Sequence, residues 1–506
     1  MKFFPATIAG LYELLLKAVC RLSVVLMSIL RKIYYSCLLT LIAANVAAQN
    51  VEVSMQPVTK LPLVSLDSSA KLAVRKIIIT GNKKTKDYMI LREIQFKPGD
   101  SIIIGNLNDA FQLARQQVYN TTLFHEVKVE LSMISAYEID VIVTVKERWY
   151  FFPSPQFQIV DRSFNEWLVK YKGDLSRVNY GLKFVHYNFS GRRDPLRLFL
   201  INGYTKNLSF SYSQPYSNGA LTQGFGIGGG FSQNREIAYK TTSDNKILFF
   251  KNENFVKKDI YFNLSFRLQK GILFRHLFNV AYSRLTISDS IIFRYNPNYF
   301  NASTTKKGLI DLSYTYQYTN VNNVTYPLKG VTSYLMLSKR GLGFTGGTNL
   351  FSIEGAYNKY WALHNNWFGS LQFLGNIKLP FDQPYINQRA IGYGNATLRG
   401  LEFYVIDGVA FGIFKSTLKK KLVSFSIPVP FKSSRIIPSL PFTIFAKTYA
   451  DAGFSYNKKK FDTNLNNRFL YTGGFGIDIL TLYDINLKIE YSFNQLGQRP
   501  FFFESR

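Results

Sequence analysis

Residues 261–268, with the sequence YFNLSFRL, alternate between polar and apolar side chains at every step. In an extended chain, successive side chains point to opposite faces of the strand. One face therefore carries Phe262, Leu264, Phe266 and Leu268, and the other carries Tyr261, Asn263, Ser265 and Arg267. This period of two predicts a β-strand that separates an apolar environment from a polar one.

The same alternation recurs at 311–318 (DLSYTYQY) and at 487–494 (LKIEYSFN). A soluble β-sandwich would show this period as well. Aromatic residues on one face, with charged and amide groups on the other, favour a membrane β-barrel instead. The chain from residue 151 to residue 506 is long enough for about 16 antiparallel strands of roughly ten residues each. We therefore predict a barrel of about 16 strands over residues 151–506.

The overall composition agrees with a sheet-rich chain. The 506 residues include 33 Tyr, 44 Phe and 4 Trp, an aromatic share of 16%, while the mean hydropathy is only −0.03. Collagen, coiled coil and wholesale disorder are excluded by 34 Gly without a triplet period and a hydrophobic share of 47%. The 61 Lys and Arg against 32 Asp and Glu give a net charge of +29, which favours contact with polyanions such as a phosphate-bearing membrane surface. Solvated basic loops and a hydrated lumen would explain the same excess.

The N-terminus has the features of a secretory signal peptide. Arg31 and Lys32 precede an apolar stretch over 33–44, and Val46-Ala47-Ala48 form a small-residue cleavage site. We predict a signal peptide over 1–48, with Met27 as an alternative start, followed by a spacer over 49–71. The only cysteines, Cys20 and Cys37, lie in this leader, so the mature chain would have neither disulfides nor cysteine metal ligands. An exported chain without apolar helices crosses a membrane only as a closed barrel.

Residues 72–150 read as a small α/β domain. The predicted order is strand, helix, helix, strand, strand, with a three-stranded sheet. Thr85 is the predicted N-cap of a first helix through Ile94, and the spacing of apolar residues predicts a second helix over 106–119. The strands are expected at 74–80, 125–131 and 137–147.

This domain resembles a POTRA domain, the periplasmic module that precedes outer-membrane assembly barrels. The resemblance rests on the strand ending in Ile79-Thr80-Gly81-Asn82, on Ile90-Leu91-Arg92-Glu93, on Gly99-Asp100, and on the closing strand through Glu147. It implies that an open sheet edge pairs with extended client segments through main-chain hydrogen bonds. The alternative is a rigid spacer that only orients the barrel.

Two barrel segments resemble motifs of the BamA/TamA superfamily. Residues 188–195 (NFSGRRDP) look like its Asn-x-x-Gly-Arg segment, and residues 320–330 (NVNNVTYPLKG) look like its central hairpin. In that hairpin Asn320, Asn322 and Asn323 stand where the family has charged residues, and Pro327 and Gly330 carry over. Any charge pairing there is therefore in doubt.

The most specific resemblance joins two further segments. Leu398-Arg399-Gly400-Leu401 is similar to the motif on the family's long sixth loop, and Tyr449-Ala450-Asp451-Ala452-Gly453 is similar to that of the thirteenth strand. The resemblance implies that the loop folds into the lumen, where Arg399 meets Asp451. A guanidinium in a partly dehydrated lumen needs a carboxylate partner. Gly400 would permit close approach of the backbone, and Gly453 would let the strand bend. This latch would either stiffen the barrel or act in a transport cycle.

The C-terminus predicts a weak closing strand. Pro500 cannot donate a ladder hydrogen bond, and only a few residues, including Phe501, Phe502 and Phe503, follow it. The family resemblance identifies such a weak seam as a lateral gate into the bilayer. An ordinary barrel end with an aromatic sorting signal would explain the same residues.

No catalytic motif accompanies these features. There is no nucleophile elbow, phosphate-binding loop or zinc-protease motif, and His125, His186, His276 and His364 lack metal-type spacing. We expect no enzyme activity, cofactor or metal. The leading hypothesis is an outer-membrane protein assembly or translocation factor of a Gram-negative bacterium, with its POTRA domain in the periplasm. The alternatives are a dedicated two-partner-type secretion translocase, a passive channel and a surface adhesin.

The leading hypothesis also names partners. These are unfolded outer-membrane or secreted clients, outer-membrane lipids and accessory lipoproteins, with no nucleic acid among them.

Overall fold

The computed structural model describes residues 68–159, 172, 174–341, 348–428, 439–458, 463–482 and 485–505. The predicted signal peptide and most of the predicted spacer lie outside these ranges. Within them, no helix has the length and apolarity needed to cross a membrane.

The N-terminal part is a small α/β domain. Its elements are β1 (Lys71–Thr80), α2 (Asp87–Leu91), β2 (Ser101–Ile103), α3 (Leu107–Tyr119), β3 (Phe124–Met133) and β4 (Glu138–Glu147), with a 3-10 turn at Ile104–Asn106 before α3. The sheet has the order β2-β1-β4-β3. The prediction of three strands was wrong, because residues 101–103 leave the turn between the helices and pair antiparallel with the start of β1.

The core of this domain follows from the alternation in its strands. Val141, Val143 and Val145 of β4 are buried against the sheet-facing side of α3, which contributes Ala114 and Val118. β4 pairs parallel with β1 and antiparallel with β3, so it is the central strand and is apolar on its covered face.

Thr85 does not cap the first helix as predicted. The N-cap residue of α2 is Lys86, and α2 ends at Leu91 instead of continuing to Ile94. The Thr85 hydroxyl lies 3.1 Å from the Tyr150 hydroxyl and accepts a hydrogen bond from the Asn188 amide at 3.0 Å. Thr85 therefore makes a tertiary contact with Tyr150 and Asn188 and does not cap a helix.

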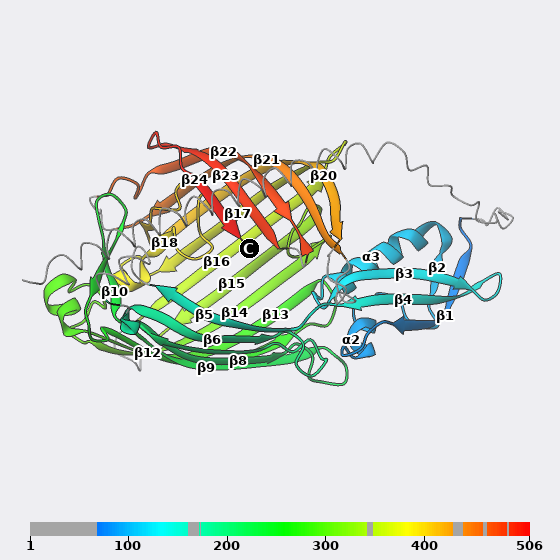
Figure 1. Ribbon diagram of the computed structural model, residues 1–506, viewed down its shortest axis with the longest axis horizontal. Coiled ribbons are helices and arrows are strands. Elements are labelled where there is room, and N and C mark those ends of the chain that lie inside the picture. Colours follow the sequence, from blue (N-terminus) through cyan, green and yellow to red (C-terminus); the bar gives the residue numbers. More distant parts are fainter. Residues whose placement is uncertain are drawn as a thin grey trace, which may run out of the picture. The chain divides into compact units, whose positions relative to one another are not determined.

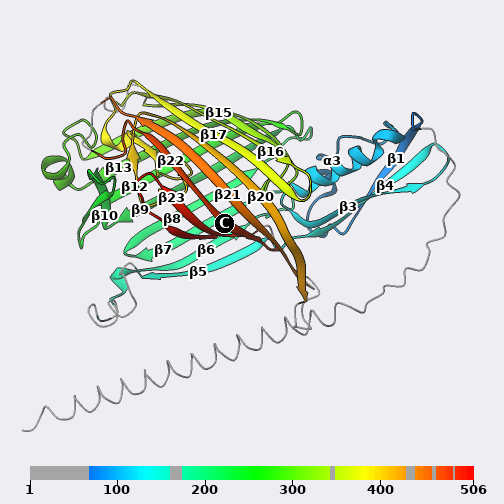
Figure 2. The ribbon, with the colours of Figure 1, turned by 90° about the horizontal axis from the view of Figure 1, so that it is seen from above.

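From residue 151 onward the chain forms a sheet of 16 antiparallel strands, which confirms the prediction. Figures 1 and 2 show the strands curving round into a barrel. They are β5 (Phe151–Ile159), β6 (Val178–His186), β7 (Leu196–Gly203), β8 (Thr205–Gln214), β9 (Gln223–Asn234), β12 (Lys257–Leu268), β13 (Phe274–Ile287), β14 (Lys306–Val321), β15 (Gly330–Arg340), β16 (Leu350–Ala362), β17 (Trp367–Leu379), β20 (Ala410–Pro428), β21 (Ser439–Tyr456), β22 (Phe469–Leu480), β23 (Asn486–Asn494) and β24 (Phe501–Ser505).

The wall is apolar on the outside. In β12, the side chains of Phe262, Leu264 and Phe266 are 43 to 48% exposed, while those of Asn263 and Ser265 on the other face are less exposed. A soluble sheet would bury its aromatic face. The exposed apolar face therefore fits lipid, and the polar face fits a hydrated lumen.

The two rims of the barrel differ. One rim contacts the α/β domain, since the carbonyl of Val321, at the end of β14, accepts hydrogen bonds from side chains at the end of α3. This rim carries the turns between β6 and β7, β8 and β9, β12 and β13, and β14 and β15. We call this the near rim. The far rim carries the hairpin of β10 (Glu236–Thr241) and β11 (Ile247–Lys251), and a long loop over residues 380–409. That loop contains η5 (Tyr385–Asn387), β18 (Arg389–Ile391) and β19 (Ile406–Asp407), and we call it the inward loop.

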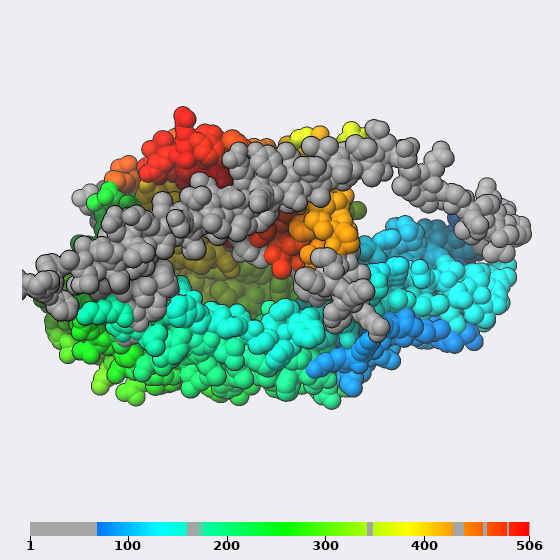
Figure 3. Space-filling model, viewed as in Figure 1, coloured from blue at the N-terminus to red at the C-terminus, as the bar shows by residue number. Residues whose placement is uncertain are grey.

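The sheet has two free edges, β5 and β24. In the described residues, β24 pairs only with β23, over five residues, and β5 pairs only with β6. Figure 3 shows the surface hollowed between the turquoise N-terminal strands of the barrel and the red C-terminal strands. We call this unpaired boundary the seam.

Candidate functional site: a luminal latch beside an unpaired seam

The inward loop places Arg399 against Asp451 of β21. The guanidinium donates to both carboxylate oxygens, with Nε to Oδ2 at 2.9 Å and Nη2 to Oδ1 at 2.5 Å, and the Arg399 amide donates to Oδ2 at 3.2 Å. The Asp451 side chain is 0% exposed and that of Arg399 is 16% exposed. The structure thus brings together the two residues that the family resemblance pairs, as a buried bidentate ion pair.

The guanidinium has further partners on the barrel wall. Nη1 donates to the Thr417 hydroxyl at 3.0 Å, and Nη2 donates to the Ser416 carbonyl at 3.2 Å. Its plane lies over the Tyr449 ring at 4.0 Å from the centroid, and the Tyr449 hydroxyl is 2.7 Å from Ser492. Arg399 therefore ties the loop to β20, β21 and, through Tyr449, β23. Such a planar set of donors suits arginine and not lysine.

Both glycines of the motif are required by close contacts. Gly400 has φ +88, and a Cβ there would lie 2.9 Å from the Ser492 Cβ. A Cβ on Gly453 would lie 2.9 Å from the Leu398 side chain. Gly453 is thus needed for the packing of the loop on β21. That it lets the strand bend stays a prediction.

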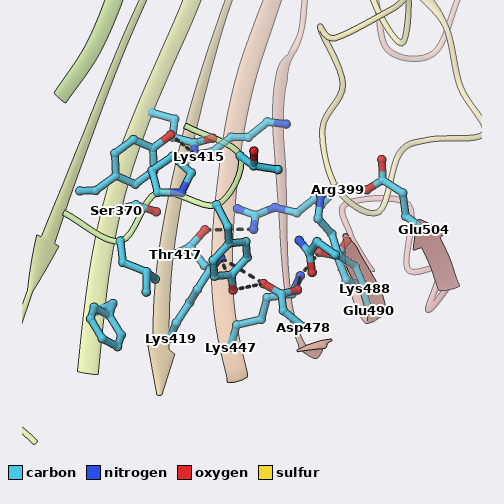
Figure 4. A pocket seen from close by; sticks show the side chains of 18 of the residues that line it. Ser370, Arg399, Lys415, Thr417, Lys419, Lys447, Asp478, Lys488, Glu490 and Glu504 are labelled. Carbon is cyan, nitrogen blue, oxygen red and sulfur yellow. Dashed lines mark hydrogen bonds and ion pairs between the residues drawn. The ribbon is translucent and has the colours of Figure 1, made fainter. Parts of the chain in front are cut away.

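A second ionic cluster lies beside the latch (Figure 4). The Lys447 ammonium of β21 binds the carboxylates of Asp478 on β22 and Glu490 on β23, and the Lys419 ammonium of β20 lies 3.0 Å from Asp478. These four side chains come from four successive strands, and those of Lys447 and Asp478 are 3% and 1% exposed. The cluster therefore fixes the lateral positions of the last long strands of the barrel.

The near-rim turn over 322–329 reaches into this cluster. The Tyr326 hydroxyl donates to Asp478 at 2.7 Å and accepts from the Lys419 ammonium at 2.9 Å, and that ammonium lies 4.1 Å from the centre of the Tyr326 ring. Sequence reasoning missed Tyr326, because its partners Lys419 and Asp478 lie 93 and 152 residues away in sequence. A tyrosine next to Pro327 in an otherwise polar turn was the available signal.

A cavity of about 660 Å³ lies between the latch, the ionic cluster and the seam, and residues of all three line it. Its walls combine Arg399, Lys415, Lys488 and Glu402 with Phe502 and Glu504 of β24. The Lys488 ammonium lies 3.1 Å from the Glu504 carboxylate. The cavity thus carries several charged side chains and borders the edge strand of the barrel.

The far-rim hairpin holds the other side of the inward loop. At its tip, the side-chain amide of Asn245 donates to the Val405 backbone carbonyl at 3.1 Å and to the Asn466 side chain at 2.8 Å. The Val405 backbone amide donates in turn to the Asn245 backbone carbonyl at 2.8 Å. Asn245 is fully buried. Nothing in the sequence of the hairpin marks it as a loop anchor.

The predicted seam residues all lie at the barrel edge. Phe501 and Phe503 are 64% and 66% exposed, and Phe503 also borders the cavity. Phe502 packs against Phe403 of the inward loop at 5.1 Å between ring centroids. The Pro500 carbonyl accepts a hydrogen bond from the Ser492 amide at 3.0 Å. The edge strand therefore touches the loop as well as β23.

The predicted POTRA motif residues form turns. Gly81 (φ +88) lies so close to β4 that a Cβ would meet the Val145 carbonyl oxygen at 2.0 Å, and the Asn82 amide donates to Asp87 at 2.6 Å. Gly99 (φ +94) donates to the Val74 carbonyl at 2.8 Å, and Asp100 accepts from the Lys97 amide at 2.7 Å. These residues set the path of the chain into α2 and into β2.

The α/β domain docks on the near rim through Arg92 and Glu93. The Arg92 guanidinium donates to the carbonyls of Leu221, Gln269 and Gly271 at 2.7 to 3.0 Å and stacks on Tyr216. The Glu93 carboxylate accepts from the Tyr216 hydroxyl at 3.0 Å and lies 3.6 Å from Arg193.

The NFSGRRDP turn takes part in the same contact. The Gly191 carbonyl accepts from the Lys86 amide at 3.0 Å, and a Cβ at Gly191 would lie 2.2 Å from the Lys84 carbonyl oxygen. The turn itself is held by Asp194, which is fully buried and accepts from the Ser190 amide and the Tyr212 hydroxyl. Its glycine is therefore needed for the docking of the α/β domain.

No group of His, Cys, Asp and Glu among the described residues is arranged to hold a metal ion. The ion pairs described above are satisfied within the protein, and we assign them no catalytic chemistry.

Comparison with known proteins identifies the α/β domain. A POTRA family model, described as a surface antigen variable number repeat, matches residues 72–148. Among solved structures, the chain is similar to BamA from Haemophilus ducreyi lacking POTRA domains 1–3 (TM-score 0.47, 15% identity, covering 86% of this chain and 85% of that chain). It is also similar to CdiB from Escherichia coli (0.46, 10%, 90% and 91%) and to CdiB from Acinetobacter baumannii (0.44, 13%, 86% and 73%).

The described residues therefore contain one POTRA domain followed by a 16-stranded antiparallel sheet with an apolar outer face. Arg399 and Asp451 make the contact that the family resemblance implies.

Proposed function

We propose that this protein inserts or translocates other proteins at the outer membrane of a Gram-negative bacterium. Its POTRA domain would lie in the periplasm and bind unfolded clients, and the seam would pass them into or across the membrane. The observation that carries this proposal is a cavity of about 660 Å³, lined by charged and aromatic side chains, that adjoins a sheet edge unpaired in the described residues.

The POTRA domain supports the first step. β3 is a ten-residue strand at one edge of its sheet, opposite the short β2. An edge strand of this length offers main-chain hydrogen bonds to an extended segment, independent of its side chains. This suits a client that has not yet folded.

The energy source follows from the environment of the product. A client strand that leaves the lumen for lipid removes its apolar side chains from water, which contributes roughly 25 cal/mol per Å². Its backbone is satisfied only when every strand is paired. Insertion is therefore favourable without nucleotide hydrolysis.

A dedicated secretion translocase is the second candidate, favoured by one stretch of the luminal wall. A Cβ on Gly226 or Gly228 of β9 would meet the side chains of Ser265 and Asn263, which share the luminal face of β12. At these positions the wall combines glycines with the small polar side chains of Asn263 and Ser265, so it would suit an extended chain that passes along it. Outer-membrane lipids and accessory lipoproteins remain proposed partners, the former because of the net charge of +29.

Depletion of the protein, followed by quantification of the outer-membrane proteome, tests the proposal. Loss of several unrelated barrels would support general assembly, and loss of one or two exported proteins would support the secretion translocase. An unchanged outer-membrane and secreted proteome, with depletion verified, would contradict both.

A further inference from the structure

Strands β20 and β21 extend past both of their neighbours at the near rim. The ladder between β17 and β20 ends at Lys420, and the ladder between β21 and β22 ends at Thr443. Beyond these points, β20 and β21 pair only with each other in the described part of the chain, as far as Pro428. We call residues 422–428 and 439–444 the rim ribbon. Figure 2 shows the orange end of β20 running across the barrel axis, so the rim ribbon stays near the level of the rim.

A β-bulge gives the rim ribbon one wholly apolar face. The register shifts between Lys421 and Val423, so Leu422 is an extra residue and the alternation of β20 changes sides. Residues that pair across two strands share a face of the sheet. Six apolar side chains therefore share one face, three from each strand: Val423, Phe425, Ile427, Leu440, Phe442 and Ile444. Without the bulge, the three from β20 would lie on the opposite face.

This apolar face continues the outer wall of the barrel. Along β21, Ile444 alternates with the set that contains Lys447 and Asp451, whose side chains point into the lumen. The six side chains therefore lie on the outer face. Nearer the far rim, the same face carries Phe414 of β20 and Phe454 of β21, which are 44% and 42% exposed.

The two faces of the rim ribbon differ in polarity. On the outer face, the rings of Phe425 and Phe442 stack at 5.5 Å between centroids, and Ile427 is 49% exposed. On the opposite face, the hydroxyls of Ser424 and Thr443 lie 2.9 Å apart and are exposed. A ribbon of two strands is at best marginally stable in water. An apolar environment on the outer face would therefore stabilise it.

The charges at the base of the rim ribbon are all positive. Lys420 and Lys421 directly precede it, and residues 420–428 and 439–446 include no Asp or Glu. The Lys420 ammonium lies 5.2 Å from the centre of the Trp367 ring. Tryptophan is enriched where a membrane meets water, and basic side chains there bind lipid phosphates.

We propose that the rim ribbon lies in the periplasmic leaflet of the membrane, with its apolar face among the acyl chains and Lys420 and Lys421 at the lipid phosphates. The observations favour lipid as the occupant, because the face continues the lipid-facing wall and has no polar side chain that would select a protein partner. The inference goes beyond the proposed function, since it requires no client. It makes the rim ribbon an anchor that sets the height of β20 and β21 in the membrane.

Spin labels test which solvent each face meets. Single cysteines for labelling are introduced in the full chain, with Cys20 and Cys37 replaced by serine, and the protein is placed in vesicles of phosphatidylethanolamine and phosphatidylglycerol. Relaxation of the label by oxygen, which concentrates among acyl chains, is compared with relaxation by a water-soluble nickel chelate. Phe425→Cys and Ser426→Cys form a matched pair, because they are adjacent in β20 and lie on opposite faces.

We expect the oxygen-to-nickel ratio to alternate along the rim ribbon. It should be high at Phe425→Cys and low at Ser426→Cys. Leu264→Cys, at a position 48% exposed on the outer wall of β12, is the control for lipid. Ser135→Cys, at an exposed turn of the α/β domain, is the control for water. The ratio at Phe425→Cys should approach that at Leu264→Cys, and the ratio at Ser426→Cys should approach that at Ser135→Cys.

A water-like ratio at Phe425→Cys, with a lipid-like ratio at Leu264→Cys, would overturn the inference and leave the proposed function standing. Low relaxation by both reagents at Phe425→Cys, relieved by dilution with unlabelled protein, would show that a second copy covers the face and would overturn it as well. Heat modifiability in gel electrophoresis verifies that each variant has folded. Ile427→Cys repeats the test on the same face, so the result does not depend on one variant.

Discussion

At the scale of single residues, we expect loss of either Arg399 or Asp451 to lower the free energy of unfolding, because each would leave its partner buried without the opposite charge. Arg399→Ala leaves the Asp451 carboxylate buried without its cation, and Asp451→Ala leaves the guanidinium with neutral partners only. Removing one member of a buried pair costs about 3–5 kcal/mol, whereas removing both is often much milder. We expect each single variant to lower the free energy of unfolding more than the double variant does, measured by urea titration in detergent. Additive losses would contradict a coupled pair.

Tyr326 allows a sharper test of the ionic cluster. Tyr326→Phe keeps the ring over Lys419 and removes the hydroxyl that Asp478 accepts from. Hydrogen bonds to charged groups contribute more than neutral ones, so we expect a loss of about 1.5–3 kcal/mol in the free energy of unfolding. Tyr360→Phe is the control, since its hydroxyl bonds to the neutral side chains of Gln372, at 3.2 Å, and Thr332. A loss no greater than that of the control would show that the turn is not held by this contact.

Some contacts of the latch and the ionic cluster could be predicted from the sequence, and others could not. Arg399 and Asp451 were predicted together because two motifs carry them. The alternation of side chains along an extended strand places Lys447 on the same face as Asp451, since they are four residues apart. Its partners Asp478 and Glu490 were not predicted, because they depend on the register between β21, β22 and β23. Register across strands is a property of the folded sheet and not of any local pattern.

At the scale of elements, α2 and its following residues fix the POTRA domain to the near rim. Arg92→Ala removes three hydrogen bonds to the turns at 221 and 269–271 and a stack on Tyr216. We expect the distance distribution between a spin label on α3 and one on a near-rim turn to broaden. The mature chain has no native cysteine to interfere with labelling, if cleavage occurs as predicted. Arg115→Ala, whose side chain bonds only to Gln112 of its own helix, should leave the distribution unchanged. A narrow distribution in both variants would mean that other contacts suffice.

The elements themselves were largely predictable. Alternation located the barrel strands, and apolar spacing located α3. The short β2 and the position of the first helix were not predicted, because three residues carry too little pattern and because Thr85 was assigned to the local backbone. Its hydroxyl instead contacts Tyr150 and Asn188, 65 and 103 residues away in sequence. Tertiary contacts of this kind override the local preference for capping.

At the scale of the whole molecule, the inward loop and the last long strands form one packed unit. Ile391, Leu398, Leu401 and Ile406 of the loop share a buried apolar cluster with Ile413 of β20 and Leu470 of β22. Arg399 anchors this unit from the lumen and Asn245 anchors it from the far rim. The seam lacks such packing, since β24 is held by five residue pairs, the Lys488–Glu504 ion pair and Phe403. The molecule is therefore expected to move at the seam and not at the loop.

A disulfide lock decides between the two roles left open for the latch. The Val405 backbone amide donates to the Asn245 carbonyl at 2.8 Å, so Asn245→Cys/Val405→Cys would tie the loop to the far-rim hairpin. If the latch stiffens the barrel, the oxidised double variant should restore the outer-membrane proteome of depleted cells as well as the unchanged protein does. The two single cysteine variants, oxidised in the same way, control for the loss of the Asn245 side chain. Restoration that fails in the double variant and recovers in a reductant would show instead that the loop must move before a client passes, and would place the latch in the transport cycle.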